Sequence, residues 1–109
     1  MKTRLLILAV VMLGLLAAAP AMAETLMMAT TTSTDNTGLL NVLGPAFQKD
    51  TGIELKWTAV GTGKALELGK NCDVDVLFVH APAAEKKYVE EGYGIDRRQV
   101  MYNDFVIIV

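Results

Sequence analysis

The stretch TLMMATTTSTDN, residues 25–36, decides the fold because it joins a predicted strand directly to a predicted helix. Its apolar run followed by β-branched threonines predicts a strand over residues 25–32. The next four residues all favour the start of a helix: Ser33, Thr34, Asp35 and Asn36. Apolar side chains then recur at helical spacing at Leu40, Leu43 and Phe47. We therefore predict one helix that begins at this cluster and continues, kinked at Gly44-Pro45, to Gly52.

The rest of the chain repeats this alternation of strand and helix. Further strands are predicted at residues 53–60, 74–79 and 105–109, with helices at residues 64–70 and 83–91 between them. The nearly unbroken apolar composition of residues 74–79 indicates a strand buried on both faces, as in parallel sheets. The order predicts an α/β fold of three layers with a mainly parallel sheet.

The first 23 residues indicate a signal peptide. Lys2 and Arg4 precede an apolar core, and Ala21-Met22-Ala23 has the small-x-small pattern that signal peptidase requires. The core is shorter than the roughly 20 apolar residues that span a membrane. We expect export to the periplasm, with residues 24–109 as the mature chain.

Charge and cysteine content exclude several classes of function. The whole chain of 109 residues has a formal charge of −2, and residues 24–109 carry eight Lys and Arg against twelve Asp and Glu, which is −4. Without a basic field, nucleic acid and anionic membranes are poor partners. The single cysteine, Cys72, excludes an internal disulfide and a multi-cysteine metal site, and we expect it to be buried. We expect a monomer with no cofactor and no resident metal.

Two loops rich in hydrogen-bond donors follow the first two predicted strands, where open α/β sheets bind their ligands. Residues 30–37 combine hydroxyls with the free N–H groups of a helix N-terminus, which suits an anion. The alternative is that the threonines end a strand while Thr34 or Asn36 caps a helix. The second loop, Gly61-Thr62-Gly63-Lys64, is by itself more typical of a turn with a cap, and it lacks the spacing of a P-loop.

His80 follows the third predicted strand and is expected at the rim of the ligand cleft that the loops at the ends of the strands would form. A lone histidine without a second ligand at metal-binding spacing is a poor metal site. As the base of a small hydrolase or lyase, with Asp35 as its partner, it would need a nucleophile. Ser33 is the only serine, and it does not lie in a G-x-S-x-G motif.

Four stretches of the chain resemble one family: ATTTSTDNTGLL at residues 29–40, FQKDTG at 47–52, AVGTGKAL at 59–66 and DVLFVHAP at 75–82. Together they closely resemble the tungstate-binding periplasmic proteins of ABC transporters. The resemblance implies a two-lobed Venus-flytrap receptor of the type II periplasmic binding protein class, not an enzyme, which captures an oxyanion for a membrane permease. Residues 24–109 would be its first lobe, and the ending on a bare apolar strand suggests that the chain is truncated before the second.

The same resemblance implies which residues bind the oxyanion. Hydroxyl and backbone donors are expected from Thr31, Thr32, Ser33, Thr62 and Gly63, with Asp35 and His80 at the rim. Tungstate and molybdate are fully deprotonated near neutral pH, so their oxygens only accept hydrogen bonds and a site of uncharged donors suits them. Monohydrogen phosphate also needs an acceptor, and Asp35 keeps phosphate open as an alternative. The preference for tungstate over molybdate comes from the resemblance alone.

Overall fold

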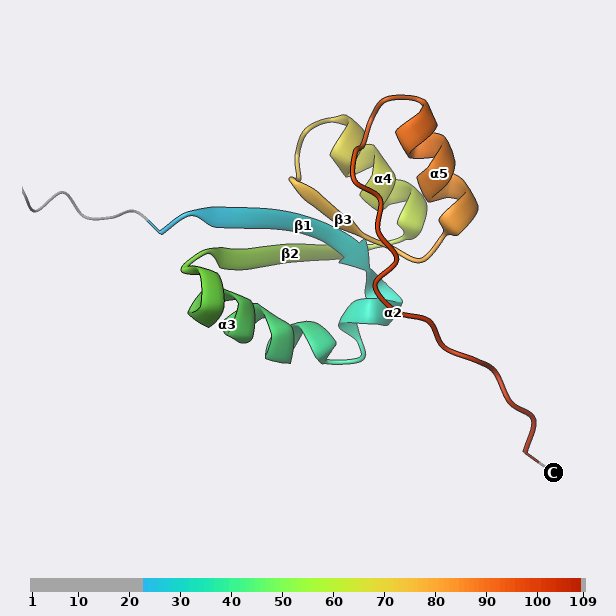
Figure 1. Ribbon diagram of the computed structural model, residues 1–109, viewed down its shortest axis with the longest axis horizontal. Helices are drawn as coiled ribbons and strands as arrows, with labels where there is room; N and C mark the ends of the chain where they lie inside the picture. Colours follow the sequence, from blue (N-terminus) through green and yellow to red (C-terminus); the bar gives the residue numbers. More distant parts are fainter. Residues whose placement is uncertain (1–22, 109) are drawn as a thin grey trace, which may run out of the picture.

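The computed structural model describes residues 23–108 as a small α/β fold (Figure 1). All but the last residue of the predicted signal peptide lies outside these residues. In chain order the elements are β1 (Thr25–Thr31), α2 (Thr32–Asp35), α3 (Leu39–Thr51), β2 (Glu54–Val60), α4 (Thr62–Lys70), β3 (Val76–Phe78) and α5 (Pro82–Glu90). None of the described helices is long and apolar enough to cross a membrane.

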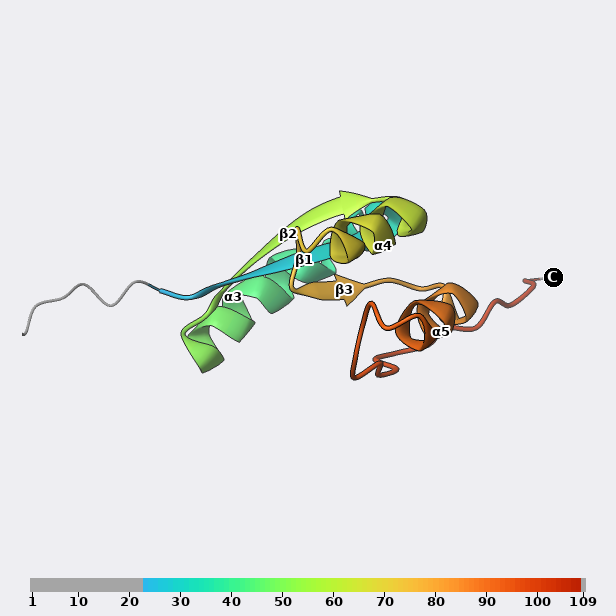
Figure 2. The same ribbon diagram turned by 90° about the horizontal axis from the view of Figure 1, so that it is seen from above.

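The strands form one parallel sheet in the order β2-β1-β3. Thr31 of β1 pairs with Val60 of β2, and Thr30 of β1 pairs with Phe78 of β3, so all three strands end at the same edge. Figure 1 shows α3 on one face of the sheet and α4 on the other, and Figure 2 shows β1 between its two neighbours. The predicted three-layer α/β fold with a parallel sheet is confirmed.

The central strand, β1, is the most deeply buried. Met28, Ala29, Thr30 and Thr31 in succession are all buried, because β1 has a strand on each side and helices on both faces. The prediction that the third strand would be buried on both faces is wrong. Val76 of β3 is 38% exposed, because β3 pairs along one edge only and no further strand among residues 23–108 covers the other.

A fourth strand at the end of the chain is also absent from the described residues. Phe105, Val106, Ile107 and Ile108 are each at least 80% exposed and belong to no regular element. A strand exists only where its backbone groups find a neighbour, and local β propensity cannot supply one. The expectation of a buried cysteine fails as well, because Cys72 is exposed in the turn after α4.

The single helix predicted after the first strand is divided in two. The turn of α2 ends at Asp35 with Asn36 as its C-cap, and α3 begins at Leu39 after Gly38, whose φ of 75° is left-handed and interrupts the helical path. The helix α3 then continues through Pro45 to Thr51, as expected. Its buried Gly44 brings the backbone against the ring of Trp57, where an added Cβ would lie 3.2 Å from the ring.

A side-chain hydrogen bond of Thr30 links the central strand β1 to its neighbour β3. It is fully buried, and its hydroxyl donates to the carbonyl oxygen of Phe78 at 2.7 Å. This bond holds the end of β3, and therefore the loop that follows it, against β1.

We predict that Thr30→Val lowers the free energy of unfolding by about 1–2 kcal/mol, because the shape is retained while a buried hydrogen bond is lost. Urea denaturation measures the change. Thr25→Val, at the exposed start of β1, is the control and should change stability by less than about 0.5 kcal/mol. Equal stability of Thr30→Val and the wild type would show that the hydroxyl does not hold β3.

Candidate functional site

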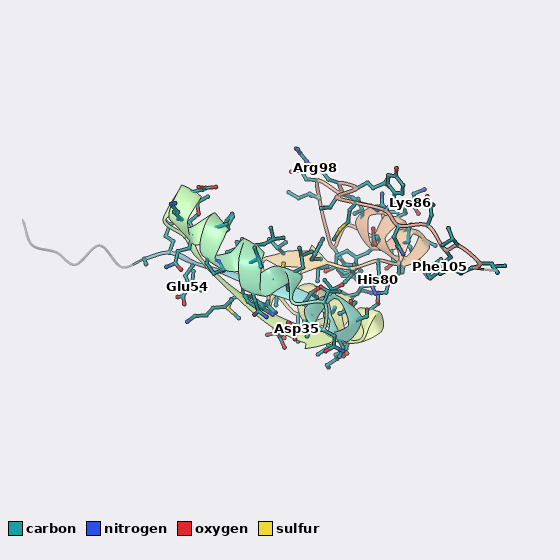
Figure 3. All side chains as sticks on the ribbon, turned by 90° about the horizontal axis from the view of Figure 1, so that it is seen from below. Asp35, Glu54, His80, Lys86, Arg98 and Phe105 are labelled. Carbon is teal, nitrogen blue, oxygen red and sulfur yellow. The ribbon has the colours of Figure 1, made fainter. Side chains whose placement is uncertain are left out.

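Three loops meet at the edge of the sheet where the parallel strands end. They lead from β1 into α2, from β2 into α4 and from β3 into α5. Figure 3 shows Asp35 of α2 and His80 at this end of the sheet, with Glu54 at the opposite end. The parallel register thus brings together residues that are far apart in the sequence, as expected for a ligand site in an open α/β sheet.

The first loop holds a connected group of hydroxyls. The Oγ1 atom of Thr31 lies 3.2 Å from Ser33 Oγ and 2.9 Å from Thr34 Oγ1. Thr31 is also the N-cap of α2, since its Oγ1 accepts from the N–H of Thr34 at 3.4 Å. The cap is therefore Thr31 rather than Thr34 or Asn36, the two residues that the sequence suggested for that role.

Capping of α2 accounts for the hydroxyl of Thr31 but not for the hydroxyls of Thr32 and Ser33, which follow it. Thr31 is only 4% exposed, whereas Thr32 and Ser33 are exposed at the start of α2. Two hydroxyl side chains are thus accessible beside the buried N-cap. This arrangement can donate hydrogen bonds to a small acceptor from solvent.

The second loop is open and unhindered. Gly61 is the N-cap of α4, and the first helical hydrogen bond runs from Ala65 N–H to Gly61 O at 2.9 Å, so the N–H groups of Thr62, Gly63 and Lys64 precede the helical ladder. A Cβ added to Gly61 or Gly63 would meet nothing within 4 Å, and neither glycine has a positive φ. The fold therefore does not require glycine at either position, whereas close approach of a ligand to the backbone would require it.

His80 contacts the first loop from the third. Its Nε2 atom lies 3.2 Å from Ser33 Oγ, and both residues are exposed. The predicted partnership of His80 with Asp35 is not formed. Instead, Asp35 Oδ1 accepts from the indole Nε1–H of Trp57 on β2 at 2.8 Å, which ties α2 to the neighbouring strand. No group of His, Cys, Asp and Glu among residues 23–108 could hold a metal ion.

Sequence reasoning missed two residues that position these loops. Trp57 was assigned only to a strand, although a half-buried indole N–H needs an acceptor, which is a usable signal. The sequence indicated Glu85 only as part of the solvated face of the predicted helix, whereas it is half-buried: its Oε1 accepts from Ala81 N–H at 2.9 Å and its Oε2 accepts from Arg97 Nε at 2.8 Å. An acidic residue in the first turn after a helical proline was the available signal for this contact, which anchors the loop next to His80.

Comparison with known proteins agrees with this architecture. A family model described as a PBP superfamily domain matches residues 17–109. The chain belongs to the PBP superfamily. A tungstate-binding protein, TupA, of Campylobacter jejuni is 60% identical over 76 residues, which are 70% of this chain and 28% of that protein. Another relative of the same name, from Peptoclostridium acidaminophilum, is 55% identical over 83 residues, 76% of this chain and 29% of that protein.

A solved structure of a similar protein shares the fold of this chain. The tungstate-binding protein TupA from Desulfovibrio alaskensis superposes with a TM-score of 0.74 at 73% identity, covering 75% of this chain and 33% of that one. The chain thus spans less than a third of the length of the curated relatives it matches, and about a third of the solved structure.

We predict that Gly63→Ala leaves the free energy of unfolding unchanged or raises it by up to about 1 kcal/mol, because alanine favours a helix and its Cβ has space. Gly38→Ala is the contrasting control and should lower it by about 1 kcal/mol, since Gly38 has a φ of 75°. Thermal or urea unfolding measures both. A clear destabilisation by Gly63→Ala would show that the fold itself requires this glycine.

Proposed function

We propose that the chain contributes an oxyanion site to the substrate-binding component of an ABC transporter and that the ligand is tungstate. One observation carries the proposal: the accessible donors of the first loop, at Thr32 and Ser33, lie at the same sheet edge as the open N-terminus of α4, at Thr62 and Gly63. The similarity to tungstate-binding proteins supports this ligand class.

The donors suit a ligand that only accepts hydrogen bonds. The proposed donors of the two loops are hydroxyls and backbone N–H groups, and the one cationic side chain in these loops, Lys64, is paired with Glu67 at 3.0 Å. Thr31 takes part through the network that links it to Ser33. Asp35, the acceptor that would favour monohydrogen phosphate, accepts from Trp57 through Oδ1 only, so its carboxylate can still accept from a ligand and phosphate stays the alternative. Molybdate shares the shape and charge of tungstate, so the choice between them rests on the relatives.

The cellular role follows from the same proposal. The protein would be exported by the signal peptide at residues 1–23, act as a monomer in the periplasm, hold no cofactor and pass its ligand to a permease. It would return the ligand unchanged and not act as an enzyme. The contact of His80 with Ser33 offers a serine and a base, but among the described residues no carboxylate orients the imidazole as nucleophilic catalysis requires.

Calorimetric titration of the full-length protein with tungstate, molybdate, sulfate and phosphate tests the assignment. We predict tungstate or molybdate as the tightest ligand and stoichiometric binding without turnover. Ser33→Ala and Thr62→Val should each weaken binding by about 1–2 kcal/mol, or roughly 5- to 30-fold, for one lost neutral hydrogen bond.

Thr25→Val, at the opposite end of β1, is the matched control and should bind as the wild type does. A preference for phosphate would overturn the ligand assignment. Unchanged affinity in both loop variants would remove these loops from the site.

A further inference from the structure

The hydroxyls of the first loop have a limited supply of hydrogens. Ser33, Thr31 and Thr34 form a row with two contacts between neighbouring oxygens, at 3.2 Å and 2.9 Å. Each hydroxyl carries one hydrogen, and each contact uses one. Three hydrogens therefore serve two contacts, and a single hydrogen is left to donate outside the row.

His80 decides where that hydrogen goes, because its Nε2 is 3.2 Å from Ser33 Oγ. If Nε2 accepts, the Ser33 hydrogen is directed to the imidazole and is lost to a ligand. If Nε2 carries a hydrogen and donates, Ser33 Oγ accepts from His80. When Thr34 also donates to Thr31 and Thr31 to Ser33, which is one of the two directions open to the row, Ser33 Oγ accepts from the Thr31 hydroxyl as well. The hydroxyl of Ser33, which is exposed, then points its hydrogen outward.

We propose that His80 is a positioning residue that donates Nε2–H to Ser33 and that, with Thr31 also donating to Ser33, leaves the Ser33 hydroxyl to donate to the bound oxyanion. This inference rests on the proposed function. The neutral imidazole with its hydrogen on Nε2 is sufficient, so the role requires no change of charge. A dianion that only accepts hydrogen bonds stabilises this arrangement, because it takes the outward hydrogen.

The arrangement also determines which oxyanions fit. With both lone pairs of Ser33 Oγ filled by Thr31 and His80, Ser33 cannot accept a hydrogen from the ligand. Monohydrogen phosphate carries one such hydrogen and would leave it unpaired, which is costly once the second lobe that we propose shields the ligand from water. His80 is therefore a specificity-determining residue that discriminates against protonated oxyanions, although it need not touch the ligand.

A double-mutant cycle in the full-length protein tests this role, with tungstate and phosphate titrated against each variant. His80→Leu keeps the approximate size and removes the donor. We expect it to weaken tungstate binding by roughly 5- to 10-fold, as for one lost hydrogen bond. We also expect it to reduce the ratio of the affinity for tungstate to the affinity for phosphate. His80→Gln places an amide donor near Nε2 and should restore both properties to within about 2-fold.

The decisive comparison is made in the Ser33→Ala background, where His80→Leu should have no further effect because the two residues act as one unit. Wild-type affinity in His80→Leu, failure of glutamine to rescue, or additive effects of the two substitutions would overturn the role of His80. If the wild type prefers phosphate, the proposed function fails instead. The same cycle measured with phosphate then shows whether His80 still acts through Ser33.

Discussion

Parallel pairing of β1 with both of its neighbours is the constraint on which the rest of the structure depends. Because the three strands run the same way and end in register, the loops at Thr31, Val60 and Phe78 open at one edge. Thr30 reinforces this arrangement with a buried hydrogen bond across to β3. Residues separated by nearly fifty positions, such as Ser33 and His80, come within hydrogen-bond distance as a consequence.

The site is assembled from weak groups whose positions are held by stronger contacts behind them. Asp35 ties α2 to Trp57, Thr31 caps the same turn, and Glu85 anchors the loop that follows His80. The proposed donors are uncharged hydroxyls and amides at the starts of α2 and α4, which lie at the same edge of the sheet. If a dianion binds here, as we propose, the selectivity of the site depends on which of its groups can only donate hydrogen bonds.

The sequence was sufficient to predict the alternation of strands and helices and the two donor-rich loops, because hydrophobic period and helix-start residues are local signals. Prediction from the sequence failed where burial or pairing of a strand depends on which neighbouring strands it has in the folded chain. Val76 and Phe105 both lie in β-rich apolar runs, yet β3 is a partly exposed edge and the later run pairs with nothing among residues 23–108. The partner of Trp57, Asp35, lies 22 residues away in the sequence, so only the folded chain identifies it. Glu85 was missed although its partner Ala81 is only four residues away.

The central claim is that uncharged donors of two loops at one sheet edge hold the oxyanion. A crystal structure of the full-length protein with tungstate tests it most directly, because the anomalous scattering of tungsten locates the ion independently of the protein model. We predict a single strong peak within hydrogen-bond distance of donors in residues 32–33 and 62–63. A fully occupied peak elsewhere, with these donors facing solvent, would contradict it.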